Sequence, residues 1–248
     1  MMYQERTYRN SMGSNRFSTL SLAIAESDVW IGYQGDVDAV ALRKEATSCI
    51  RHLRLQILGY EDPAFLSSLV PLAPKGKVPG FLKQMFEATE KANVGPMASV
   101  AGAVAQALGS HLKNKFSLSE IVIENGGDLY IDVLKPIFVK LFAPTSRFSG
   151  KISMIVVPQY CPLGICTSSA TLGHSMSFGK ADAVMVACSD AALSDAYATA
   201  YCNKVQKKED VKSVCEALNA NADVISALVV LDDMLAVGGR LEVSTHDE

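Results

Sequence analysis

The chain has 248 residues, 49% of them hydrophobic and 20% charged, with a formal net charge of −3 at pH 7. This balance is typical of a globular protein and excludes a disordered one, and an acidic chain gives no support for a nucleic-acid partner. No apolar run approaches the ~20 residues of a membrane span, and MMYQERTYRNSMGSN lacks the apolar core of a secretory signal. We therefore expect a cytoplasmic protein without a membrane partner.

Residues 1–16 are predicted to form a short basic arm, with Arg6, Arg9 and Arg16 in solvent, and residues 17–248 a single domain. Alternating hydrophobicity predicts strands over 17–25 and 28–33. Asp38 is a suitable N-cap for a helix through Leu58. The loop PLAPKGKVPG then leads into a second helix that ends near residue 92.

The next predicted helix, GPMASVAGAVAQALGSHL, has an unusually small side-chain stripe. It begins with Pro96 at a position where the missing N–H costs nothing. Glycine inside a helix loses ~1 kcal/mol against alanine. The stripe therefore predicts close approach of the helix backbone to a sheet, another helix or a ligand; its members are Ala98, Ala101, Gly102 and Ala105.

The stretch ENGGD lies between two apolar runs, the first at residues 121–123. Gly126 and Gly127 could make a hairpin turn. Flanked by Asn125 and Asp128, they could also let bare amides approach an anion. Both interpretations stay open from spacing alone.

Further strands are predicted over 137–143 and 152–157, in ADAVMVACSD, and in a hairpin within DVISALVVLDDMLAVGGRLEV. Asp190 is a suitable N-cap for the Ala-rich helix AALSDAYATAYCNKV. Because consecutive strands are often close enough for hairpins, we predict an α+β fold with largely antiparallel sheets packed against helices.

The segment CTSSATLGHSMSFGKAD, residues 166–182, is rich in small polar side chains. Ordering such a loop costs entropy and buries little apolar area, so packing alone explains it poorly. We predict that it lines a site, with Cys166 accessible as a thiolate and His174 as a general acid or base. The predicted ligand contacts of this segment are Thr167, Ser168, Ser169, Gly173 and Ser175.

Asp195 and Thr199 are four residues apart and share one face of the predicted helix. A carboxylate and a hydroxyl among alanines form a plausible site for Mg²⁺, which prefers oxygen ligands and keeps waters or phosphates. The alternative is that Thr199 bonds back to a carbonyl one turn earlier while Asp195 is exposed.

The motif ENGGD between two strands is followed by Thr-Ser-Ser, a histidine, another strand and finally SDAYATA. With its motifs in this order, the chain resembles the ApbE superfamily over about residues 95 to 205. Its best-known members are Mg²⁺-dependent flavin transferases that attach FMN from FAD to a protein threonine. The resemblance implies an ApbE-like architecture, Mg²⁺ at Asp195 and Thr199, and FAD or FMN near Gly126 and Gly127. It also implies ligand contacts at Ser168 and Ser169 and a pocket histidine near His174.

CTSSATLGHSMSFGKAD more closely resembles a branch of that superfamily found in archaea and anaerobic bacteria, which is linked to sulfide assimilation. This resemblance covers nearly the whole chain. The chain also departs from the transferases. Gln106 stands where the transferases have an aspartate. The transferases have a Ser-Gly pair where this chain has Ser168 and Ser169, and a hairpin between that pair and their pocket histidine; this hairpin is missing here. Their later Asp-Pro-x-Thr-Gly segment and an export signal are missing as well.

The leading hypothesis is a protein that binds a flavin-like or other phosphorylated ligand with a divalent metal, and its enzymatic version is a transferase. The alternative is a sulfur-handling protein in which Cys166 carries sulfide. A non-catalytic assembly subunit is a third reading, and an oligomer is possible in each case.

Overall fold

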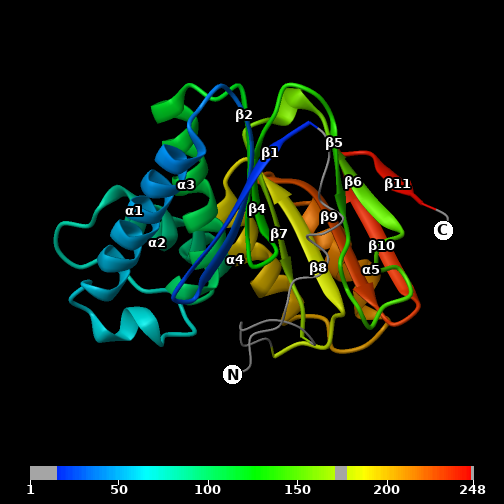
Figure 1. Cartoon of the computed structure of the whole chain (residues 1–248). Coiled ribbons are helices and arrows are strands. Elements are labelled where there is room, and N and C mark those ends of the chain that lie inside the picture. The colour runs from blue at the N-terminus through cyan, green and yellow to red at the C-terminus, as the bar shows by residue number, and fades with distance from the viewer. Residues whose placement is uncertain (1–15, 171–177, 247–248) are drawn as a thin grey trace.

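The computed structural model describes residues 16–170 and 178–246, and an eight-stranded antiparallel sheet runs through it (Figure 1). The strand order is β1-β2-β3-β4-β7-β8-β9-β10. These strands are β1 (Ser18–Ile24), β2 (Ser27–Gln34), β3 (Glu120–Asn125), β4 (Asp128–Asp132), β7 (Leu163–Ser168), β8 (Ala183–Cys188), β9 (Val224–Leu231) and β10 (Met234–Gly239).

A three-stranded sheet covers part of one face of the large sheet. It has the order β11-β6-β5, with β11 (Val243–Thr245), β6 (Ile152–Val156) and β5 (Ile137–Lys140). Buried side chains of the two sheets form one hydrophobic cluster, for example Leu129 and Ile165 with Met154 and Val156. Residues of the large sheet alternate between this cluster and the helices on the other face.

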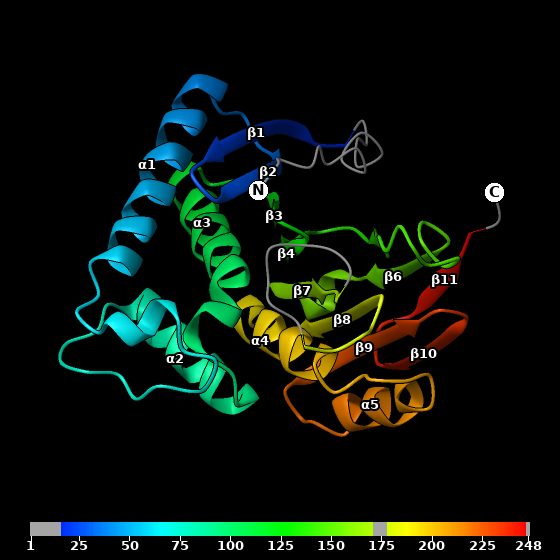
Figure 2. The ribbon, with the colours of Figure 1, turned by 90° about the horizontal axis from the view of Figure 1, so that it is seen from below.

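The helices lie on the opposite face of the large sheet, most of them in direct contact with its strands (Figure 2). They are α1 (Ala39–Leu58), α2 (Gly80–Ala92), α3 (Val100–Phe116), α4 (Ala191–Cys202) and α5 (Asp210–Asn219), with short 3₁₀ turns η2 (Pro63–Leu66), η3 (Pro96–Ser99) and η4 (Pro158–Tyr160). Within the described ranges, none of them combines the length and apolarity that a bilayer span requires.

The predicted α+β class with largely antiparallel sheets is confirmed. The N-caps are also as predicted, since Asp38 accepts from the Val40 amide at 2.9 Å and Asp190 from the Leu193 amide at 2.9 Å. The helix predicted after residue 95 begins as the tight turn η3 and continues as α3. The sequence pattern did not predict α5.

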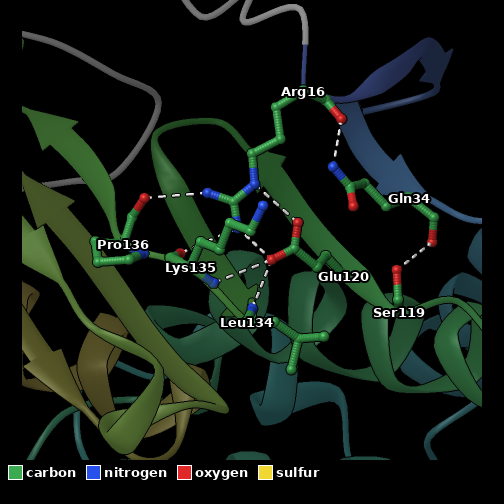
Figure 3. Close-up of polar contacts among 7 residues, drawn as sticks. All are labelled: Arg16, Gln34, Ser119, Glu120, Leu134, Lys135 and Pro136. Atoms are coloured by element: carbon green, nitrogen blue, oxygen red, sulfur yellow. Dashed lines mark hydrogen bonds and ion pairs between the residues drawn. The ribbon is translucent and has the colours of Figure 1, made fainter.

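Arg16 was expected in solvent, and this prediction is wrong. Its side chain is only 19% exposed and forms a salt bridge with the buried Glu120 (Figure 3). The guanidinium also donates to the carbonyls of Lys135 and Pro136, while Glu120 accepts from the Leu134 amide at 2.6 Å. A buried carboxylate needs such partners, so Arg16 is fixed against the sheet.

Candidate functional site

Asp195 lies on α4, a helix in the interior of the protein. Eleven of its 12 residues are buried, and most are small. Asp195 Oδ2 accepts a hydrogen bond from the Gly102 amide at 3.0 Å. That amide is one of the donors in the first turn of α3 that have no partner within the helix, so a carboxylate there satisfies the amide and interacts favourably with the helix dipole.

The two helices cap each other where they meet. Gln106 Oε1 of α3 accepts from the Ala191 amide, the first residue of α4, at 2.6 Å. A Cβ added to Gly102 would lie 2.1 Å from the Ala191 carbonyl oxygen. The predicted close approach of this helix is therefore confirmed, and the neighbour is another helix. Gln106 therefore serves as a cap for the first turn of α4.

Asp128 begins β4, beside β7, and accepts from the Thr167 amide at 3.3 Å. Asp128 and Asp195 are both buried, 7% and 8% exposed. Burial raises the pKa of Asp195 well above its ordinary value, and the nearby Asp128 charge raises it further, against the opposing amides of Gly102 and Ala101. Each of these neighbouring buried carboxyl groups disfavours ionisation of the other, and a bound cation would favour their charged forms.

A pair of hydroxyls lies one helical turn from Asp195. Ser168 of β7 and Thr199 of α4 are hydrogen-bonded, with 3.1 Å between their oxygens. Asp195 is buried, and Thr199 finds its partner on the sheet. The alternative of an exposed Asp195 with Thr199 bonded back along the helix is therefore wrong. The predicted oxygen face exists, and it points toward β7.

The ENGGD stretch is a hairpin turn between β3 and β4. Gly126 and Gly127 have φ of 73° and 103°, a region that favours glycine. The Gly127 amide donates to Glu124 Oε1 at 2.7 Å, and Asn125 Nδ2 donates to the Ala101 carbonyl at 3.1 Å. The turn interpretation is confirmed, and Asn125 holds this hairpin against the start of α3. Anion binding by these residues stays a prediction.

The prediction of an accessible, reactive Cys166 is wrong. This residue lies in β7, not in a loop, and strand alternation directs it toward α4, where it is 0% exposed. Its Sγ lies 3.3 Å from the Ala191 carbonyl oxygen, to which it donates. Burial raises the pKa of the Cys166 thiol well above its ordinary value, and the charges of Asp128 and Asp195 raise it further.

Of the other residues predicted to contact a ligand in this segment, some lie within the described residues and some do not. Thr167 and Ser169 are partly exposed, beside the buried Ser168. Gly173, His174 and Ser175 lie outside the described residues. The fold therefore brings together four of the predicted residues from three elements, namely Asp128, Ser168, Asp195 and Thr199.

The chemistry of this cluster fits a hard cation. Within residues 16–170 and 178–246, no three His, Cys, Asp or Glu side chains are grouped so that they could hold a metal ion. Two carboxylates and two hydroxyls provide only oxygen donors, and four such donors are fewer than the six ligands of Mg²⁺, which takes oxygen ligands and usually keeps several waters. The sequence did not reveal that Ala101 and Gly102 supply amides to Asp195; the small-residue stripe was the available signal.

A family model described as AbpE bacteria matches residues 9–236. The UPF0280 protein of Methanocaldococcus jannaschii is 37% identical over 213 residues, which cover 83% of this chain and 85% of the relative. The UPF0280 protein of Methanopyrus kandleri is 34% identical over 230 residues, 90% of each chain.

Solved structures of flavin transferases have a similar fold. The flavin transferase ApbE of Vibrio cholerae superposes with a TM-score of 0.60 at 14% identity, covering 89% of this chain and 96% of that one. The Pseudomonas stutzeri flavinyl transferase ApbE gives 0.60 at 12% identity, with 90% and 93% covered. At this identity, the likeness shows a shared fold.

Proposed function

We propose that this protein binds a divalent cation together with a flavin-like or other phosphorylated ligand. The chain belongs to the family described as AbpE bacteria, which is related to the ApbE flavin transferases. The observation that carries this proposal is the buried pair Asp128 and Asp195, with the hydroxyls of Ser168 and Thr199 beside it. Burying two neighbouring carboxylates in their charged forms is costly, and a bound cation would lower that cost.

In this proposal Asp195 and Thr199 bind Mg²⁺, and Asp128 contributes a second negative charge. The bound ion would neutralise charge on a phosphate, which is the main electrostatic demand of phosphoryl transfer. The amides of Ala101 and Gly102 orient the Asp195 carboxylate, so the start of α3 positions the ligand set. Ser168 holds the Thr199 hydroxyl toward β7.

The metal can be tested by isothermal titration of Mg²⁺ with FAD, FMN or ADP present. Asp195→Asn keeps an oxygen for the Gly102 amide but lowers the charge, so we expect the Mg²⁺ affinity to fall at least ~10-fold. Thr199→Val should weaken binding less. Asp232→Asn, an exposed acid on the β9–β10 turn, is the control. Equal Mg²⁺ affinity in wild type and Asp195→Asn would contradict the proposal.

FMN transfer to a threonine-containing peptide is expected to be poor. Gln106 is bound to the Ala191 amide and supplies no carboxylate, unlike the acid of the transferases. Mass spectrometry after incubation with FAD, Mg²⁺ and the peptide measures it. Efficient flavinylation would contradict this prediction and show that the sequence differences from the transferases do not abolish FMN transfer. A protein that binds neither cation nor nucleotide would favour the non-catalytic subunit.

Burial of Cys166 removes the observation that supported sulfide transfer. We therefore propose no sulfur chemistry at this thiol.

A further inference from the structure

The outer face of α1 combines exposed apolar side chains with basic ones. Half of the large hydrophobic side chains exposed in the described ranges lie between residues 40 and 70. On α1 they are Val40, Leu55 and Leu58, which are 74%, 67% and 52% exposed. Single exposed apolar residues are ordinary, but several within one region indicate an interaction surface.

The exposed charges on α1 have a single sign. Arg43, Lys44 and Arg51 are exposed, while the acid of this helix, Glu45, is partly buried and paired with Lys115. The chain as a whole has a net charge of −3, so this positive face is a local feature. Within the part of the chain that the structure describes, Lys44 and Arg51 have no ion pair.

Two shallow hollows join along this face. One, of about 510 Å³, is lined by Lys44, Arg51 and Leu55. The second, of about 430 Å³, shares Leu55 and continues to Lys75 and Lys77, with Glu61 as its acid. Lys75 is itself paired with Asp62 at 2.7 Å. Both views place α1 and the segment that leads to α2 at the end of the molecule opposite β5 and β11 (Figures 1 and 2).

We propose that this face, defined by Lys44, Arg51, Leu55, Leu58 and Lys77, docks on an anionic lipid surface. Exposed aliphatic side chains beside Lys and Arg are typical of segments that lie in the membrane interface, where the basic residues are attracted to anionic headgroups. Protein interfaces instead favour aromatic residues and are depleted in Lys. The expectation of no membrane partner rested on the lack of a spanning run, which does not bear on peripheral binding.

The test is flotation of the full chain with vesicles of phosphatidylglycerol and phosphatidylcholine, against phosphatidylcholine alone. We expect binding to the anionic vesicles only, and its loss at high salt. Lys44→Glu with Arg51→Glu should reduce binding at least ~10-fold. Leu55→Ser should reduce it more weakly. The control, Lys140→Glu with Lys212→Glu, makes the same charge change on β5 and α5 and should leave binding unchanged.

Three results would overturn the proposal. The first is no binding to anionic vesicles at low salt. The second is an equal loss in both double variants, which would indicate only the overall charge. The third is binding of polyglutamate, or self-association by light scattering, that is lost in Lys44→Glu with Arg51→Glu while vesicles are not bound; it would assign the face to an acidic protein or a second copy. Unchanged melting of the variants would show that folding is intact.

Discussion

The α3–α4 crossing and the outer face of α1 use their side chains in opposite ways. At the crossing, a backbone carbonyl lies where a Gly102 side chain would be, and each helix caps the other. On α1, only five of 20 residues are buried, and they lie on one stripe. The crossing therefore fixes the geometry of the candidate site, whereas the α1 face is available for an interaction with another surface.

The contrast should be largest in thiol reactivity. Cys166 at the crossing is fully buried, and Cys49 on α1 is partly exposed. Burial raises the pKa of Cys49 to about 11, so neither thiol is activated, and access decides the rates. We expect Cys166 to be alkylated by iodoacetamide at least ~100-fold more slowly than Cys49, because modification requires an opening of the structure. Peptide mass spectrometry over time measures both. Similar rates would place Cys166 at an accessible surface.

Substitution of Gly102 should give the largest loss of stability. In Gly102→Ala, the added methyl overlaps backbone that cannot rotate away, so we expect the free energy of unfolding to fall by about 3 kcal/mol or more. Gly80→Ala is the matched control, because a Cβ at that first residue of α2 meets nothing within 4 Å. Urea unfolding measures both. A Gly102→Ala variant as stable as wild type would mean that α3 and α4 are far enough apart at the crossing to accept a methyl group.

Breaking a buried salt bridge should destabilise the protein more than breaking an exposed one. Arg16→Ala removes the partner of buried Glu120 and should cost about 1–3 kcal/mol. Arg54→Ala, which breaks an exposed pair on α1 with Glu26, should cost under ~1 kcal/mol. Equal losses would show that burial does not decide the strength of these pairs.

The Arg16 pair should also respond to pH. Burial acts to raise the pKa of Glu120, but the Arg16 guanidinium and the Leu134 amide outweigh it and hold the pKa below its ordinary value. The stabilisation is therefore fully present above the pKa of an unfolded glutamate, ~4.3, and is lost as pH falls through the lower folded pKa. Unfolding curves from pH 7 to pH 3 should bring wild type and Arg16→Ala together. A constant difference would exclude this linkage.

Local patterns predicted the elements better than the contacts. The caps at Asp38 and Asp190 depend on a few neighbouring residues and were predicted correctly, and the turn at ENGGD was one of the two interpretations left open. Cys166 was predicted wrongly because composition suggested a loop, whereas pairing with β4 and β8 makes it a strand that faces α4. The sequence likewise contained the Asp195–Thr199 spacing but not its partners, because Asp128 and Gly102 reach it only through long-range packing.

The smallest expected effect separates two roles of Asp195, as a cap for α3 and as a buried charge. Asp195→Asn retains an oxygen for the Gly102 amide and removes one of two neighbouring carboxylate charges. Asp195→Ala removes both functions. In buffer with EDTA, we therefore expect the Asn variant to be at least as stable as wild type, and the Ala variant to be about 1 kcal/mol less stable than the Asn variant, the usual contribution of a helix cap. Urea unfolding at one pH measures the three proteins. If Asn and Ala variants are equally stable, the bond to Gly102 contributes nothing, and the Asp195 carboxylate is retained for its charge alone. If the Asn variant is less stable than wild type, repulsion from Asp128 is not a cost in the folded protein, and the argument for a cation at this pair loses its basis.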